Sequence, residues 1–126
     1  WNSYIIKTPR QNIFWGGDSG YGKHFAEVGD KHGPFDWAAL EIDAWNSRWP
    51  DIHLFPEQAV QAALDLKATR LLPIHWGAYD LGYHQWDTSI NRVTEAAGGK
   101  PLELMTPAMG EKLLPGVTPT AKWWLL

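Results

Sequence analysis

The chain has 126 residues and a mass of 14.3 kDa, a size that suits a single domain covering residues 1–126. It contains no cysteine, which excludes a disulfide framework, thiolate zinc ligands and thiol catalysis. A hydrophobic fraction of 44%, a net charge of −3 and a pI near 5.9 fit a folded domain without a basic surface for nucleic acid or an anionic membrane.

Short β-rich runs, apolar helical stripes and the Gly, Pro and Asn residues between them predict nine elements in the order β-β-α-β-α-β-α-β-β. The predicted elements are strands at 4–7 and 13–15, a helix at 22–31, a strand at 35–42, a helix at 56–67, a strand at 71–75, a helix at 88–97, and strands at 102–105 and 111–114. The helix that begins at Pro56 has the strongest pattern, because Pro and Glu57 suit its first turn and an apolar stripe follows. The expected fold class is therefore one α/β layer with hairpins at its ends.

Both ends of the chain carry large apolar side chains. The chain begins at Trp1 without an initiator Met or a secretory signal, and no apolar run reaches the ~18 residues that span a membrane. We therefore expect no membrane span, a cytoplasmic location and a start that lies inside a larger domain. Residues 122–126 form an apolar tail, for which a core strand, a docking segment and an exposed end are all open.

Four polar side chains lie where a predicted strand ends or a helix is about to begin. Asp18 is in the glycine-rich run 16–22 and His75 ends a strand, while His53 and His84 precede the two later helices. Asp and His are ligands suited to Zn²⁺, and the loop edge of an α/β sheet is where ligands bind. A structural interpretation is also open, with the aspartate capping a turn and the histidines in the core or in loops. The long spacings include no H-x-H or H-x-x-x-H pair, so residue type alone does not decide between the two.

Three strings, in chain order, resemble segments of the metallo-β-lactamase-fold hydrolases. Residues 14–21 (F-W-G-G-D-S-G-Y) resemble the family's F-x-G-D-T-G-Y segment. Residues 53–60 (H-L-F-P-E-Q-A-V) resemble H-M-N-P-E-E-A-V, and residues 72–77 (L-P-I-H-W-G) resemble x-P-I-H-W-G. The most similar branch contains N-acyl-phosphatidylethanolamine-hydrolysing phospholipase D and its RomA-like and lactonase-like bacterial relatives. The resemblance covers about residues 4–97.

The resemblance implies a fold, a metal centre and a hydrolytic activity. The fold is the second half of an αββα sandwich, a mixed sheet with hairpins and with helices on one face. The complete enzyme would hold two zinc ions, with Mn²⁺ or Fe as alternatives; Asp18 would bridge both ions and His75 would bind the second. Asp18 and His53 are the implied catalytic residues, His53 as a substrate-side or proton-handling group. A metal-activated water would cleave an ester, lactone, amide or phosphodiester bond.

The resemblance also implies a pocket for a small-molecule or lipid-like substrate. Arg48 lies in the loop where relatives carry E-P-R-W and would meet an anionic group, with a surface arginine as the alternative. The pocket-lining candidates are Trp45, Trp76 and His84. Relatives tend to have Gly-Ala-Tyr where this chain has D-A-W at 43–45, so this wall of the pocket departs from the family.

One departure limits the expected activity. The family's H-x-H-x-D-H motif, which supplies most ligands of the first metal, does not occur in the 126 residues. The resemblance therefore implies the C-terminal half of the domain, with partial or no metal occupancy and no hydrolysis by the isolated chain. Its partner would be the missing N-terminal half.

Two further interpretations depend on tryptophans rather than on metal ligands. Nine tryptophans are unusually many for this length, and such large aromatic side chains gather in pockets and interfaces. In the first interpretation, a non-catalytic structural or interaction module forms a homodimer through an exposed sheet face that includes Trp15, Trp37 and the pair Trp123–Trp124. In the second, surface tryptophans bind a sugar or an aromatic ligand.

Overall fold

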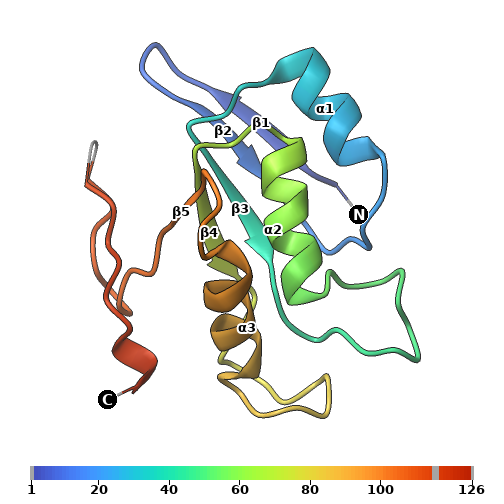
Figure 1. The fold of residues 1–126 in the computed structure, drawn as a ribbon. Helices are drawn as coiled ribbons and strands as arrows, with labels where there is room; N and C mark the ends of the chain where they lie inside the picture. Colours follow the sequence, from blue (N-terminus) through green and yellow to red (C-terminus); the bar gives the residue numbers. More distant parts are fainter. Residues whose placement is uncertain (1, 115–116, 126) are drawn as a thin grey trace.

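The β-rich runs assemble into one mixed sheet, with the helices on one of its faces (Figure 1). The computed structural model describes residues 2–114 and 117–125. The strands are β1 (Tyr4–Lys7), β2 (Asn12–Trp15), β3 (Trp37–Glu41), β4 (Arg70–Ile74) and β5 (Glu103–Leu104). They lie side by side in chain order, β1-β2-β3-β4-β5. The expected α/β class, with a mixed sheet and helices on one face, is confirmed.

The strand directions determine where the loops gather. β1 and β2 form the predicted antiparallel hairpin, in which Tyr4 lies opposite Trp15. The hydroxyl of Thr8 holds the turn by accepting a 2.9 Å hydrogen bond from the N–H of Gln11. The pairs β2–β3, β3–β4 and β4–β5 are parallel. Because parallel strands end at the same edge, the segments that follow β2, β3 and β4 are brought together.

Three helices pack on the sheet because each carries an apolar stripe. They are α1 (His24–His32), α2 (Pro56–Asp65) and α3 (Thr88–Ala97), close to the predicted ranges. The core between helices and sheet includes Phe14, Leu40 and Leu71 from the strands and Phe25, Val60, Ile90 and Val93 from the helices. In the described part of the chain, no helix combines the length and the apolar character that crossing a membrane requires.

The opposite face of the sheet is apolar but only partly covered. A small cluster is buried there, formed by Ala39, Leu72 and Met105. Trp15 pairs with Ala39 and Tyr4 pairs with Trp15, so these side chains point to the same face. Tyr4, Ile6 and Trp15 are 59%, 44% and 42% exposed. We call this surface the open sheet face.

The prediction of a strand at 111–114 is wrong. The N–H of Met105 still donates to the Leu71 carbonyl at 2.8 Å, but Pro107 follows and has no N–H for continuing the ladder. Within the described ranges, residues 111–114 lie outside every strand. Leu114 is more than half exposed, so this run has no buried face that would hold it in a sheet.

The C-terminal tail docks on the chain's own core. Trp123–Leu125 form a short 3₁₀ helix, η1, and Trp124 is buried with its indole N–H donated to Asn91 Oδ1 at 2.9 Å. Of the three interpretations of the tail, the one as a docking segment is confirmed for residues 123–125. Leu126 lies outside the described residues. Trp124 does not belong to an exposed sheet face, and that part of the homodimer hypothesis is wrong.

Gly29 of α1 lies against the backbone at the end of α2, and this generates a prediction. A Cβ at position 29 would overlap the carbonyl oxygen of Asp65 and stand 2.9 Å from Leu66 Cα. We predict that Gly29→Ala forces the helices apart and lowers the free energy of unfolding by about 1–3 kcal/mol, measured by urea denaturation. Lys31→Ala, at an exposed position of the same helix, is the control and should change it by less than about 0.5 kcal/mol. Equal stability of the two variants would contradict this packing.

Candidate metal centre

Four ionisable side chains meet at the edge where β2, β3 and β4 end. Asp18 follows β2, Glu41 is the last residue of β3, His75 follows β4, and His53 comes from the loop before α2. Each offers one ligand atom, and the four atoms all lie within 4.8 Å of one another. The structure thus brings together three of the four polar side chains singled out in the sequence, and Glu41 joins them.

Glu41 is the buried member of this group and holds the others in place. Its side chain is 2% exposed. Oε2 is hydrogen-bonded to His53 Nδ1, while Oε1 accepts the backbone N–H of Ser19 at 2.7 Å and that of Leu54 at 3.4 Å. One carboxylate therefore links the loop after β2 to the loop before α2.

The environment of Glu41 makes it a weaker acid than an exposed glutamate. Burial raises the pKa of its carboxyl above the ordinary value of 4.5, because the charged form loses its hydration. The hydrogen bonds from Ser19 and with His53 act in the opposite direction, and the negative charge of Asp18 adds to the increase. The carboxyl therefore keeps its proton to higher pH, unless a cation lies beside it.

His75 lies between the two carboxylates. Its Nε2 is 3.8 Å from Asp18 Oδ1 and its Nδ1 is 3.7 Å from Glu41 Oε2. Its ring stacks on that of His53, with the centroids 5.3 Å apart. The backbone of His75 is left-handed, with φ at +65°, which is a strained conformation for a residue other than glycine. The chain thus turns sharply after β4 and leaves the imidazole at the edge of the sheet.

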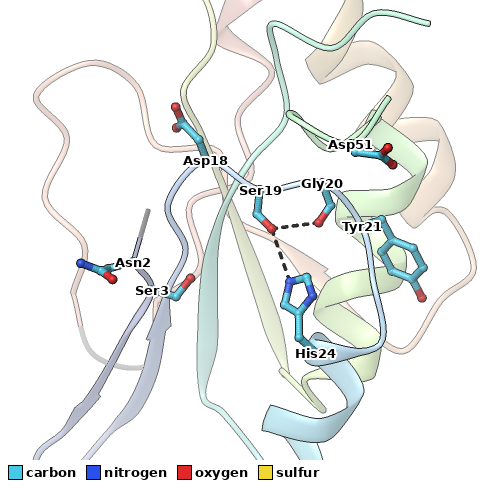
Figure 2. A pocket seen from close by; sticks show the side chains of 8 residues that line it. All are labelled: Asn2, Ser3, Asp18, Ser19, Gly20, Tyr21, His24 and Asp51. Carbon is cyan, nitrogen blue, oxygen red and sulfur yellow. Dashed lines mark hydrogen bonds between the residues drawn. The ribbon is translucent and has the colours of Figure 1, made fainter. Parts of the chain in front are cut away.

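A polar pocket of about 430 Å³ adjoins this group at Asp18 (Figure 2). Figure 2 shows the Ser19 side chain between the backbone of Gly20 and the imidazole of His24. The Ser19 hydroxyl donates to the Gly20 carbonyl at 2.8 Å and lies 3.4 Å from His24 Nε2. Asp51 contributes a second carboxylate to the lining. The pocket offers hydrogen-bonding groups and negative charge.

A second pocket, of about 380 Å³, adjoins the group at His75 and is mostly apolar. Trp76, Ile90, Met105 and Trp123 are among the side chains that line it. Trp76 thus lies beside the candidate metal centre. A polar and an apolar pocket therefore adjoin the same four ionisable groups.

The remaining expected site residues form a separate group outside the four-residue cluster. The His84 ring stacks on Trp45 with the centroids 4.5 Å apart. His84 Nε2 lies 3.1 Å from Asp43 Oδ1, yet it makes no directed hydrogen bond among the described residues. Arg48 is exposed, with its guanidinium 5.9 Å from the centre of the Tyr83 ring. The structure does not place Trp45, Arg48 and His84 in the group of four ionisable side chains.

Sequence reasoning misses Glu41. It lies in the apolar run 35–42, which predicts only a buried strand. The available signal is an acidic residue near the end of such a strand, because a buried carboxylate requires partners. The position of those partners, His53 and Ser19, depends on loops whose conformation the pattern does not determine.

Known proteins share sequence with much of this chain. A family model described as the beta-lactamase superfamily domain matches residues 1–76. An uncharacterized protein of Mycobacterium tuberculosis is 38% identical over 130 residues, covering 100% of this chain and 35% of that protein. Outer membrane protein RomA of Klebsiella pneumoniae is 46% identical over 77 residues, covering 61% of this chain and 58% of that protein. N-acyl-phosphatidylethanolamine-hydrolyzing phospholipase D 1 of Caenorhabditis elegans is 33% identical over 85 residues, covering 65% of this chain and 24% of that protein.

Solved structures share the fold at low sequence identity. A putative metal-dependent hydrolase from Parabacteroides distasonis aligns with a TM-score of 0.56 and 17% identity, over 82% of this chain and 38% of that one. The metallo-beta-lactamase fold protein YhfI from Bacillus subtilis aligns with a TM-score of 0.60 and 17% identity, over 81% of this chain and 39% of that one. The chain thus spans between about a quarter and three-fifths of the length of these similar proteins.

The raised pKa of Glu41 generates a prediction about pH and stability in metal-free buffer. In the unfolded chain the carboxyl loses its proton near 4.5, whereas the folded chain keeps it to higher pH. The folded state then binds more protons, so its stability falls as the pH rises from 4.5 through the raised pKa, by about 1.4 kcal/mol for each pH unit between these two values. We predict that Glu41→Gln removes this decline, measured as urea unfolding free energy between pH 4.5 and 8 with a chelator present.

Glu95→Gln, at an exposed position of α3, is the matched control and should follow the wild-type curve. A wild-type curve that runs parallel to that of Glu41→Gln over the whole pH range would show that burial does not govern this carboxyl.

Proposed function

The chain belongs to the beta-lactamase superfamily, and from this premise we propose that it provides part of the active site of a metal-dependent hydrolase. The observation that carries the proposal is the meeting of Asp18, Glu41, His53 and His75 at one edge of the sheet. Active sites of α/β proteins lie at the carboxyl ends of parallel strands, and this is such an edge. The P. distasonis protein that shares the fold is described as a putative metal-dependent hydrolase, which is consistent with this proposal.

The donor set fits a divalent cation such as Zn²⁺. Imidazole nitrogen and carboxylate oxygen bind zinc at about 2.0–2.2 Å, so neighbouring ligand atoms of a tetrahedral site lie roughly 3.3 Å apart. The separation of His75 Nε2 from Asp18 Oδ1, 3.8 Å, is close to that spacing. A cation would also compensate the buried negative charge of Glu41. We propose zinc, with two ions in the complete centre.

The contacts of each group suggest its role. Asp18 and His75 face each other through Oδ1 and Nε2, and we propose them as metal ligands. Glu41 binds His53 Nδ1 and approaches His75 Nδ1, so it orients both rings and leaves their Nε2 atoms for a metal or a proton. His53 is the proposed proton carrier. A bound divalent cation supplies a water of lowered pKa and polarises the scissile carbonyl or phosphoryl group.

We propose that the bond cleaved is an ester, lactone, amide or phosphodiester. The support is the family together with the C. elegans relative, whose name describes a phospholipase D. A small-molecule or lipid-like substrate is consistent with one polar and one apolar pocket beside the same site. Within this proposal, Arg48, Trp45 and His84 belong to the wall farther from the metal ligands.

Residues outside this chain are proposed to complete the centre and the domain. The chain spans 35% of the mycobacterial relative, and the H-x-H-x-D-H motif is not among its 126 residues. The open sheet face leaves Tyr4, Ile6 and Trp15 exposed, as expected for a surface that packs on a second sheet. We therefore propose that the isolated chain binds a metal ion but has little or no hydrolytic activity.

The metal-site proposal predicts zinc binding that depends on particular side chains. Isothermal titration of the chain with ZnCl₂ should show binding, and His75→Ala or Asp18→Asn should weaken it by more than about 100-fold, because removing even a contact to a ligand costs 10–100-fold. His32→Ala is the matched control, since His32 ends α1 and lies outside the four-residue group.

Equal zinc affinity of the wild-type chain and the His75→Ala variant would contradict the proposed site. Turnover of p-nitrophenyl esters or phosphodiesters by the zinc-loaded chain should not exceed that of a solution of zinc alone. Turnover in the range typical of an enzyme, about 1–1,000 s⁻¹, would contradict the proposal that the isolated chain is incomplete.

The open sheet face supports a second candidate function, a homodimeric interaction module. Three large apolar side chains are exposed side by side at the hairpin, and isologous pairing of two copies would bury them. Light scattering at micromolar concentration should then give twice the mass of the chain, and Ile6→Glu should return it to the mass of one. Lys112→Glu, at an exposed position in the segment after β5, is the charge-altering control. A single-chain mass for the wild type would count against this function.

A further inference from the structure

The left-handed backbone of His75 requires something to hold it. At φ +65° a side chain with a Cβ crowds its own backbone, and such conformations persist only where the surroundings fix them. On one side of His75, the N–H of Ile42 donates to the carbonyl of Ile74 at 3.2 Å and fixes the end of β4 on the neighbouring strand. On the other side the chain continues into Trp76 and then Gly77, whose φ is +75°. After His75, the chain is held to the end of β4 by the indole N–H of Trp76, which donates to the Pro73 carbonyl.

Trp76 is the centre of a group of four indole rings, which we call the tryptophan cluster: Trp76, Trp86, Trp123 and Trp124. Trp86 and Trp123 both stack on Trp76, with centroids 6.4 and 5.3 Å away and interplanar angles of 6° and 27°. Trp124 meets Trp76 edge-on at 5.9 Å. These are the offset and T-shaped geometries that aromatic pairs prefer.

The members of the cluster are anchored independently of His75. The indole N–H of Trp76 donates to the Pro73 carbonyl at 3.2 Å, which folds the ring back over the end of β4. The indole N–H of Trp123 donates to the Pro107 carbonyl at 3.0 Å, and that of Trp124 donates to Asn91 of α3. The C-terminal helix η1 is therefore attached at two points and presents a fixed surface to Trp76.

We propose that the tryptophan cluster positions His75 for metal binding, so that Trp123, near the C-terminal end of the chain, acts on the metal site through Trp76. This inference rests on the proposed metal site. Without Trp123 the Trp76 ring loses its nearest stacking partner, and the peptide after His75 is free to leave the left-handed conformation. The imidazole then no longer points steadily at Asp18 and Glu41, so the metal site loses affinity although every ligand is present.

Zinc affinity of the full 126-residue chain tests the inference, because it does not depend on catalytic activity. We expect Trp123→Ala to weaken zinc binding about 10- to 100-fold, the range found when supporting contacts of metal ligands are removed. Trp123→Phe keeps a stacking ring and should retain most of the affinity. Trp37→Ala is the matched control, because Trp37 is also half-buried but begins β3 at the end of the strand opposite Glu41.

Repeating the Trp123→Ala substitution in a second variant separates an effect on the position of His75 from a general loss of structure. In a His75→Ala chain, Asp18, Glu41 and His53 keep a weak residual affinity, and Trp123→Ala should leave that affinity unchanged. Circular dichroism and urea denaturation establish that each variant is folded under the titration conditions. If Trp123→Ala does not fold, Trp86→Ala replaces it, since Trp86 is half exposed and its loss should still weaken zinc binding several-fold.

The outcomes separate the metal site from the role of the cluster. If the wild-type chain binds no zinc, the proposed metal site is wrong and the positioning inference falls with it. If the wild type binds zinc and Trp123→Ala or Trp86→Ala binds it equally well, the positioning inference is wrong and the metal site stands. If Trp37→Ala weakens binding as much as Trp123→Ala does, or if Trp123→Ala lowers affinity equally in the His75→Ala background, the cluster has only a structural role.

Discussion

The buried carboxylate of Glu41 is the interaction on which the site depends. A charged side chain that is 2% exposed is costly unless hydrogen bonds or opposite charges compensate it. The compensation comes from two loops: the N–H of Ser19 after β2, and the ring of His53 together with the N–H of Leu54 before α2. Each contact fixes a loop that the sheet alone would leave free. The cost of burying Glu41 is thus also the reason why the loops that carry Asp18 and His53 converge.

The parallel sheet supplies the second condition, because it determines which chain segments can reach Glu41 at all. β2, β3 and β4 are neighbours and run in the same direction, so the residues after them share one edge. Asp18 and His75 are 57 positions apart in the sequence, yet their side chains lie 3.8 Å from each other there. The helices between the strands pack on one face of the sheet. They thereby keep the strands parallel and leave this edge of the sheet uncovered.

Much of this fold follows from local patterns. The hairpin and all three helices lie where the sequence places them, because turn residues and apolar stripes act over a few residues. The strand expected at 111–114 fails since a strand needs a partner, and Pro107 ends the only ladder within reach in the described chain. Glu41 escapes prediction for a related reason, as its role depends on loops distant in sequence. Asp18, His53 and His75 are accessible to sequence reasoning through family strings, whereas the positions of Trp45 and His84 depend on how the loops after β3 and before α3 fold. The cytoplasmic location, the identity of the metal and the bond cleaved stay predictions.

Two groups of tryptophans in the described chain are in different environments, which set different requirements for the side chain. Trp15 lies on the open sheet face, where a large apolar side chain gains by being covered, whichever surface covers it. Trp123 and Trp124 instead meet Trp76 and Asn91 within the chain, where specific ring geometries and N–H donors matter. Burial of the first kind tolerates other large apolar residues, aliphatic ones included, whereas the second kind requires an indole or a ring that stacks like one. Substitution by leucine therefore distinguishes the two groups: it should leave zinc affinity nearly unchanged at Trp15 and lower it at Trp123. The difference follows from geometry, since a stacked ring transmits an orientation to its neighbour and an aliphatic side chain only fills space.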